Sequence, residues 1–220
     1  MAIRPTELAG VSTDGAWLYT RNLDPGHAVY GEGLVVDQGA EYRKWDATRS
    51  KLAAYLKRGG RVWPFRPTTT ILYLGAGSGT TASHLSDLCP QGSVVAVEIA
   101  PRVFRDLVTV AERRPNLIPI LADAAAPDTY RSHVGSVDVL YQDVAQRDQE
   151  AIFLRNLGFL HPGGVAFLVV KARSVDVAAK PADVYATARD RLSRGGCEIL
   201  DLRSLDPFEA DHAMIVVRGP

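Results

Sequence analysis

The sequence contains only two cysteines, Cys89 and Cys197, and no pair with the spacing of a zinc-binding or redox motif. A disulfide framework and a zinc site are therefore not expected, and an intracellular protein is favoured. The longest apolar runs, such as residues 165–170, have the length of a strand and are too short to cross a bilayer. The amino-terminal residues also lack the apolar stretch of a secretory signal.

An excess of positive charge is also absent, because 25 Lys and Arg residues are balanced by 25 Asp and Glu residues. Bulk electrostatic attraction is therefore not expected to hold RNA on this protein. Residues 41–66 are a local exception, since they contain eight cations and two acids. This segment is either an ordinary solvated face or a patch that contacts phosphate groups.

The 220 residues suit one domain of ordinary size with a smaller appendage, and two patterns divide the chain. In residues 1–66, short apolar pieces at 16–20 and 34–36 are separated by Gly and Pro, which predicts small antiparallel strands. A helix is expected over residues 46–58, with Asp46 as its cap. We therefore predict a small β-rich region that ends in a basic helix.

From Thr70 onward, apolar segments of strand length alternate with segments of helix length. Pro101 and Pro181 stand where the first turn of a helix accepts proline. The alternation predicts a parallel sheet with helices on both faces. The fold class is therefore α/β, with a doubly wound, mostly parallel, seven-stranded Rossmann-like sheet in residues 67–220. The expected strands are 70–74, 93–98, 117–121, 136–142, 164–171, 197–202 and 212–217, and the expected helices are 79–88, 101–113, 147–158 and 181–194.

A glycine-rich turn follows the first of these strands and precedes a helix. Gly75, Gly77 and Gly79 lack the Cβ atoms that would keep the backbone away from a ligand. The spacing is G-x-G-x-G, and Thr80 stands where a dinucleotide-binding loop has its third glycine. The loop therefore favours S-adenosylmethionine over NAD as the cofactor.

Two acids end the next two expected strands. Glu98 lies 23 residues after Gly75, where a carboxylate can accept hydrogen bonds from both hydroxyls of a ribose. Asp123 is followed by three alanines, which leave room for a flat adenine. Because the carboxyl ends of parallel strands meet at one edge, the glycines and both acids are expected to form one nucleoside site. The alternative is that Glu98 caps a helix and Asp123 only forms a turn.

Together with these features, several longer motifs resemble the fibrillarin family, and above all its archaeal members. Tyr73 stands two residues before the first loop glycine, where many other methyltransferases have an acid, in agreement with this family. The Gly/Arg-rich arm of eukaryotic fibrillarins is missing, so a cytoplasmic, archaeal-type protein is expected. The resemblance covers nearly the whole chain and rests, besides the glycine loop, on residues 22–26, 29–32, 43–46, 50–54, 97–102, 141–146, 170–173 and 211–213.

The resemblance implies the catalytic subunit of a C/D-box guide RNA–protein particle. Such a subunit methylates ribose 2′-oxygens of rRNA and, in archaea, of tRNA with S-adenosylmethionine as the methyl donor. The implied partners are the C/D-box guide RNA, the target RNA, a scaffold protein of the Nop family and a kink-turn-binding protein of ribosomal type, with no membrane. Besides the three glycines, the implied cofactor contacts are Thr80, Thr81, Glu98, Ile99, Asp123, Ala124, Asp143, Val144, Ala145 and Gln146.

Asp143 and Lys171 follow two neighbouring expected strands, on the edge that carries the glycine loop. A ribose hydroxyl is a weak acid, so a methyl-transfer site must align its oxygen and ease the removal of its proton. Asp143 could hold Lys171 or the hydroxyl in position. The resemblance extends this pair to a catalytic set of Lys51, Asp143, Lys171 and His212. We assign Lys171 to the proton transfer, Asp143 to orientation, Lys51 to placing the substrate and His212 to support.

Each member of the set except Lys171 also has a simple alternative interpretation. Lys51 can be a surface charge in a basic helix, and His212 can be an ordinary strand residue. Asp143 can cap a helix that begins near Gln146. The remaining four histidines share no spacing that suggests a metal site.

Three other functions stay open. A methyltransferase-like structural subunit without activity is disfavoured because Lys51, Asp143, Lys171 and Glu98 are all present. An NAD-dependent oxidoreductase is disfavoured by the glycine spacing. A stand-alone small-molecule methyltransferase would need a lid or an inserted substrate domain, which residues 1–66 do not resemble. Because the chain has no charge excess, a guide RNA and partner proteins are expected to supply the specificity.

Overall fold

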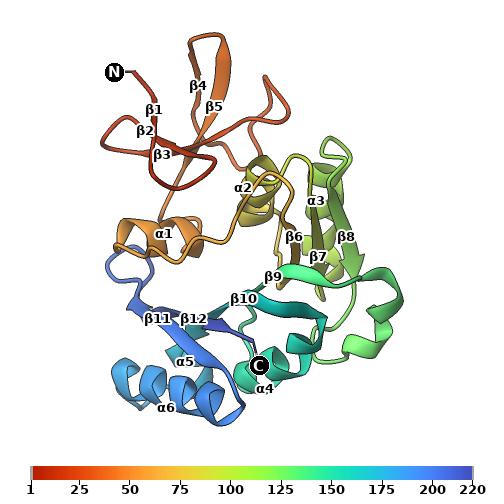
Figure 1. Cartoon of the computed structure of the whole chain (residues 1–220), viewed down its shortest axis with the longest axis vertical. Helices are drawn as coiled ribbons and strands as arrows, with labels where there is room; N and C mark the ends of the chain where they lie inside the picture. The colour runs from red at the N-terminus through yellow and green to blue at the C-terminus, as the bar shows by residue number, and fades with distance from the viewer. Residues whose placement is uncertain (1, 220) are drawn as a thin grey trace.

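Two β-sheets form the framework of the computed structural model, which describes residues 2–219 (Figure 1). The smaller sheet is antiparallel and has the order β1-β2-β3-β5-β4. It lies above the larger sheet in Figure 1, and its β4–β5 hairpin projects away from the rest of the chain. Its strands are β1 (Arg4–Pro5), β2 (Val11–Thr13), β3 (Leu18–Arg21), β4 (Leu34–Asp37) and β5 (Ala40–Trp45).

The larger sheet has seven strands in the order β11-β12-β10-β9-β6-β7-β8. Its neighbours from β10 to β8 pair in parallel, whereas β12 is antiparallel to both β10 and β11. The predicted α/β fold, with a mostly parallel seven-stranded sheet and a small amino-terminal β-rich part, is therefore confirmed. The strands are β6 (Thr70–Leu74), β7 (Ser93–Glu98), β8 (Leu117–Leu121), β9 (Val137–Gln142), β10 (Leu160–Lys171), β11 (Glu198–Ser204) and β12 (His212–Arg218).

The strand order reverses between β6 and β9. The chain first adds β7 and β8 on one side of β6 and then crosses to the other side, where it adds β9. In open α/β sheets, ligands bind at such a switch point, outside the carboxyl ends of the strands. The residues that follow these four strands are Gly75, Ile99, Ala122 and Asp143. The topology therefore gathers the segments with the expected cofactor residues at one edge.

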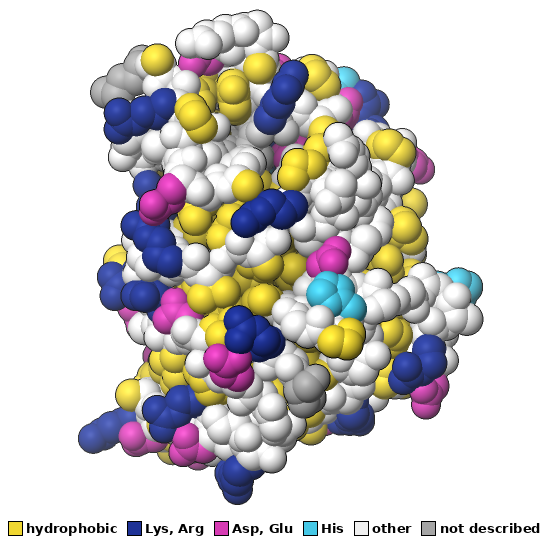
Figure 2. Space-filling model, in the orientation of Figure 1, with side chains coloured by type: hydrophobic (Ala, Val, Ile, Leu, Met, Phe, Trp, Pro, Cys, Tyr) yellow, Lys and Arg dark blue, Asp and Glu magenta, His cyan; other side chains and the backbone are white. Residues whose placement is uncertain are grey.

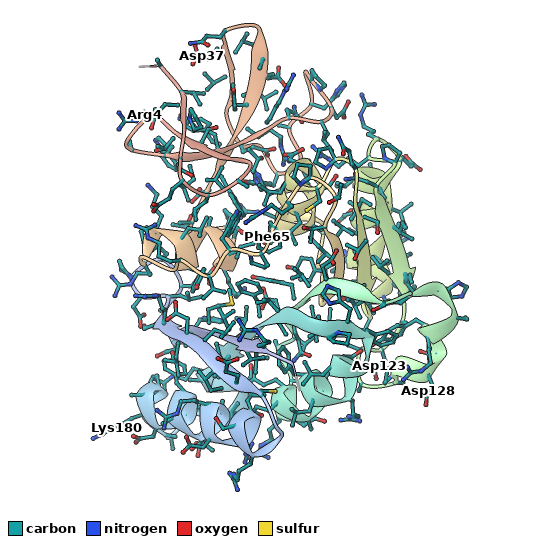
Figure 3. The ribbon with its side chains drawn as sticks, viewed as in Figure 1. Arg4, Asp37, Phe65, Asp123, Asp128 and Lys180 are labelled. Carbon is teal, nitrogen blue, oxygen red and sulfur yellow. The ribbon has the colours of Figure 1, made fainter. Side chains whose placement is uncertain are left out.

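Helices cover both faces of the larger sheet: α1, α2 and α3 lie on one face, and α4, α5 and α6 lie on the other (Figure 1). Side chains alternate along each strand, so Tyr141 of β9 packs in the core with α1, whereas Leu140 packs in the core with α4 and α6. Phe65 lies within the first of these cores (Figure 3). The helices are α1 (Lys51–Lys57), α2 (Thr80–Leu88), α3 (Pro101–Ala111), α4 (Gln149–Asn156), α5 (Ala172–Val175) and α6 (Pro181–Arg194).

No helix within residues 2–219 is long and apolar enough to cross a membrane. Cys89 and Cys197 are free and buried. In the same part of the chain, no group of three or more His, Cys, Asp or Glu side chains could hold a metal ion. The expected boundary near residue 66 stays a prediction, because α1 shares its core with strands of the larger sheet.

The expected elements beyond Thr70 are confirmed apart from their ends. β10 begins at Leu160, four residues earlier than expected, because an irregular register precedes its regular pairing. The helix expected over residues 46–58 is wrong at its start, since α1 begins at Lys51. The Asp46 carboxylate accepts hydrogen bonds from the backbone N–H and the hydroxyl of Thr48, each at 2.8 Å. Asp46 therefore forms a turn before the helix and does not cap it.

A buried cluster of charged side chains joins the smaller sheet to α2. Asp87 of α2 accepts a hydrogen bond from Arg43 of β5 at 2.8 Å and one from Arg114 at 2.5 Å. Arg43 also donates to Glu32 at 2.6 Å. Arg43 belongs to the basic segment 41–66, but its side chain is fully buried, so a surface interpretation is wrong for it. Figure 2 shows other Lys and Arg side chains along the edge of the molecule beside α1.

The same cluster contains an uncharged histidine. The two ring nitrogens of His84 lie 2.8 Å from the hydroxyl groups of Thr20 and Tyr30. Burial lowers the pKa of His84 well below its ordinary value, and the nearby guanidinium groups of Arg43 and Arg114 act in the same direction. The ring therefore links the two parts of the chain through hydrogen bonds as a neutral group.

We predict that Asp87→Asn lowers the free energy of unfolding by about 3–5 kcal/mol, because two buried guanidinium groups lose their shared anion. Denaturant titration followed by circular dichroism measures the change. Asp128→Asn is the control, since Asp128 pairs with Arg131 on the surface (Figure 3) and should leave the unfolding midpoint nearly unchanged. An equally small effect of Asp87→Asn would contradict the structural role of the cluster.

Candidate active site

The glycine loop connects β6 to α2 and lies against the segment that follows β9. Gly75 donates a backbone hydrogen bond to the carbonyl oxygen of Val97 at 2.9 Å. The φ angle of Gly75 is +78°, and a Cβ on this residue would lie 2.4 Å from the carbonyl oxygen of Asp143. Only glycine therefore allows the loop and the Asp143 segment to approach so closely.

Glu98 supports the glycine loop and the start of α3 at the same time. One carboxylate oxygen accepts the N–H of Gly77 at 2.8 Å, and the other accepts the N–H of Ala100 at 2.8 Å. Ala100 directly precedes α3, so this second bond holds the residue before the helix, but Glu98 does not cap the first turn of α3. The side chain also lines a cavity, and each oxygen keeps a second lone pair for a ligand.

Asp123 forms a turn soon after β8. Its carboxylate accepts the backbone N–H of Ala125 at 2.8 Å, so the turn interpretation is confirmed. In Figure 3, Asp123 lies beside the larger sheet, and Asp128 lies farther out on the same connection. Asp123 also lines the cavity that Glu98 lines. The Asp123 carboxylate therefore forms the turn and can also accept hydrogen bonds from a ligand in the cavity.

A cavity of about 360 Å³ lies at the carboxyl edge of the sheet, at the switch point between β6 and β9. Val97 and Ala122 also line it and were not expected, although Val97 directly precedes Glu98 and Ala122 directly precedes Asp123. Ten of the thirteen expected cofactor residues line it, namely Gly75, Gly77, Glu98, Ile99, Asp123, Ala124, Asp143, Val144, Ala145 and Gln146.

The other three expected cofactor residues stand at the start of α2 and do not line the cavity. Gly79 precedes the helix, and Thr80 is its first residue. Thr81 is buried, and its hydroxyl donates to the Ser50 hydroxyl oxygen at 3.0 Å. A ligand in the cavity could therefore reach this segment only from its Gly77 side.

Lys51 and Asp143 form an ion pair at the same edge. The Lys51 ammonium lies 2.9 Å from a carboxylate oxygen of Asp143, and about a fifth of each side chain is exposed. Burial alone would lower the pKa of Lys51, but Asp143, with a smaller contribution from Glu209, raises it above the ordinary value. The interpretation of Lys51 as a surface charge is therefore wrong, and the group is an ammonium at neutral pH.

Lys171 and His212 lie on the same face of the sheet as this ion pair. They are direct neighbours across the antiparallel pairing of β10 and β12. Side chains alternate along a strand, so Lys171 points to the same side as Phe167 and Val169, which pack in the core with α1. The four expected catalytic residues therefore share one edge and one face, although they come from four segments of the chain.

Two details differ from the sequence-based interpretation. Asp143 is paired with Lys51 and not with Lys171, whose ammonium group makes no hydrogen bond or ion pair within residues 2–219. Asp143 does not cap α4, because that helix begins at Gln149 and Asp148 precedes it. The Nδ1–H of His212 donates a hydrogen bond to the carbonyl oxygen of Ala210 at 2.7 Å, because a carbonyl oxygen can only accept.

Comparison with known sequences agrees with this geometry. The protein-family model described as fibrillarin matches residues 8–219. A protein of Aeropyrum pernix described as a fibrillarin-like rRNA/tRNA 2′-O-methyltransferase is 52% identical over 198 residues. That match covers 89% of this chain and 85% of the relative.

Solved structures of related proteins also agree with the geometry of this chain. A crystal structure of Aeropyrum pernix fibrillarin with natively bound S-adenosyl-L-methionine has a TM-score of 0.90 and 47% identity, and covers 99% of this chain and 98% of that one. The structure of a fibrillarin/Nop5p complex has a TM-score of 0.89 and 36% identity, and covers 97% and 99%. Because both the family model and the relatives match nearly the whole chain, the protein belongs to the fibrillarin family.

Proposed function

We propose that this chain transfers a methyl group from S-adenosylmethionine to ribose 2′-oxygens of rRNA and tRNA, as the catalytic subunit of a C/D-box guide RNA–protein particle. The relatives' described activity and the S-adenosyl-L-methionine bound in the Aeropyrum pernix fibrillarin support it. One observation in this chain carries the proposal. Asp143 lines the cavity and also pairs with Lys51, so a nucleoside site and a cluster of proton-handling groups meet at one residue.

The cavity fits the nucleoside part of S-adenosylmethionine. Its volume of about 360 Å³ lies in the range of small-molecule sites. Glu98 and Asp123 offer carboxylate oxygens to hydroxyl and amino groups, and Ala122 and Ala124 leave space for a flat ring. When bound, the cofactor supplies a methyl group that is already activated on a sulfonium. The remaining tasks, to hold the ribose and to remove its proton, fall to the side chains of the chain.

These side chains divide the work according to their partners. Lys51 keeps its proton beside Asp143 and therefore acts as a hydrogen-bond donor and a charge, not as a base. Asp143 accepts a hydrogen bond from the ribose hydroxyl and orients it. Lys171, whose Nζ has no hydrogen-bond or ion-pair partner within residues 2–219, lies nearest the hydroxyl proton that must leave, and His212 beside it supports Lys171.

Partners supply the specificity in this proposal. The formal charge of the chain is zero, which argues against tight binding of free RNA. A scaffold of the Nop family is supported by the solved complex of a fibrillarin with Nop5p. We propose that this scaffold, a kink-turn-binding protein and a C/D-box guide RNA place the target ribose at the carboxyl edge.

We predict that the isolated chain binds S-adenosylmethionine but not NAD, and that it methylates free RNA poorly. The reason is a complete nucleoside cavity on a protein without excess positive charge. Titration calorimetry with both cofactors and a filter-binding methylation assay measure the two properties. Binding of NAD alone would contradict the cofactor, and efficient site-specific methylation of free RNA would contradict the guided particle.

We predict that Glu98→Ala weakens S-adenosylmethionine binding by roughly 1.5–3 kcal/mol, because a charged acceptor is lost. Glu98→Gln should lose less, since its amide oxygen still accepts one of the two backbone N–H groups. Titration calorimetry on variants with a wild-type melting temperature measures the affinities. Unchanged affinity in a folded Glu98→Ala variant would mean that this carboxylate serves only the loop and α3.

We predict that Lys171→Ala lowers the single-turnover rate and leaves the cofactor affinity nearly intact, because Lys171 does not line the cavity. Asp143→Ala should lower both, because Asp143 does line it. The double variant should be much less than additive in rate, since the two residues serve one step. Methylation in a reconstituted guide RNA particle is the assay. A wild-type rate for Lys171→Ala would contradict its assignment.

A further inference from the structure

Ser50 stands at the N-cap of α1 but does not cap the helix. Its backbone is extended, with φ −144° and ψ 115°, as at an ordinary N-cap. A serine in this position usually accepts a hydrogen bond from a backbone N–H of the first turn, which stabilises the helix. The Ser50 side chain makes no such bond. The hydroxyl is therefore used for another purpose.

The Ser50 hydroxyl instead joins α1 to α2. Its oxygen accepts a hydrogen bond from the Thr81 hydroxyl at 3.0 Å, and the two residues are only 1% and 6% exposed. Thr81 is the second residue of α2, the helix that directly follows the glycine loop. A buried hydroxyl pair thus ties the start of one helix to the start of the other.

This hydrogen bond closes a ring of contacts around the site. Ser50 is followed by Lys51, which pairs with Asp143 at 2.9 Å. The backbone carbonyl of Asp143 lies so close to Gly75 that a Cβ on Gly75 would clash with it. Gly75 begins the loop that connects β6 to α2, and Thr81 is the second residue of that helix. A shift of α1 would therefore move Lys51 away from the edge where Asp143 and the loop meet.

We propose that Ser50 and Thr81 are positioning residues for methyl transfer, whose hydrogen bond holds Lys51 against Asp143 at the cavity. The Thr81 hydroxyl then serves Lys51 and not the cofactor, in agreement with its burial away from the cavity. This inference rests on the proposed roles of Lys51 and Asp143.

The remaining contacts of α1 explain why the effect should be on rate more than on folding. Leu52, Tyr55 and Leu56 are buried in the core, and they hold the helix body without Ser50. When Thr81 loses its hydroxyl, Ser50 becomes free to cap α1, which offsets part of the lost stability. The first turn of α1 then stays helical, but the hydrogen bond that fixed its distance from α2 is lost.

The test is the single-turnover rate in a reconstituted guide RNA particle at saturating S-adenosylmethionine, together with the cofactor affinity of each isolated variant. Ser50→Ala and Thr81→Val should each lower the rate about tenfold, as expected for a small displacement of a group at the site. The double variant should be no slower than either single variant, because one bond is lost once. Thr81→Ser, which keeps the donor, should restore the rate, and the cofactor affinity should stay within about twofold in all four variants.

Ser86→Ala is the matched control. Ser86 is also a buried serine on α2, and its hydroxyl donates to Asn116 at 2.7 Å, away from Lys51. It should lower the melting temperature by a similar amount and keep the wild-type rate. An equal loss of rate in Ser86→Ala would overturn the proposal, because general softening of α2 would then suffice.

Two other results would also overturn it. The first is a wild-type rate in Ser50→Ala and Thr81→Val. The second is a Thr81→Val variant that binds S-adenosylmethionine poorly and reacts normally when saturated, which would make Thr81 a cofactor contact.

The variant Lys51→Ala separates this inference from the proposed function. A slow Lys51→Ala beside normal hydroxyl variants removes only the positioning role, whereas a normal Lys51→Ala removes the role of Lys51 itself.

Discussion

The placement of the amino-terminal sheet depends on one buried carboxylate. Asp87 is the shared partner of Arg43 and Arg114, and neither guanidinium group can leave water without an anion beside it. Arg43 lies on β5, and β5 leads through a short turn into α1. The carboxylate on α2 therefore helps to hold β5 against α2. The turn after β5 leads into α1, whose first residue is Lys51.

The chain uses two kinds of ion pair for two purposes. The Arg43–Asp87 pair is fully buried, so water and ligands cannot exchange with either partner. The Lys51–Asp143 pair keeps about a fifth of each side chain exposed, so a polar group of a substrate can share its hydrogen bonds. Burial strengthens a charge pair and also makes it costly to disturb. The degree of burial thus separates the pair that holds the fold from the pair at the site.

The sequence predicts those features of the fold that depend on neighbours along the chain. The strands and helices beyond Thr70 follow from local hydrophobic periodicity, and the glycine loop, Glu98 and Asp123 follow from the rule that strand ends meet at one edge. The resemblance to fibrillarins, and not this rule, implied Ile99, Ala124 and residues 144–146. The partners of charged groups do not follow in this way. Arg43 and Asp87 are 44 residues apart, and Lys51 and Asp143 are 92 apart, so only the folded chain pairs them. The cap expected at Asp46 failed because Thr48 competes for the same carboxylate.

The position of β12 has a consequence for the order in which the chain can fold. β12 comes after β11 in the chain but lies between β10 and β11 in the sheet, and within residues 2–219 it is the only strand that β11 pairs with. Until residues 212–218 are synthesised, β10 presents an open edge and β11 has no place in the sheet. All the residues that line the cavity, the last of which is Gln146, are therefore synthesised well before His212. The last strand therefore has two effects. It pairs with the open edge of β10, and it places His212 beside Lys171.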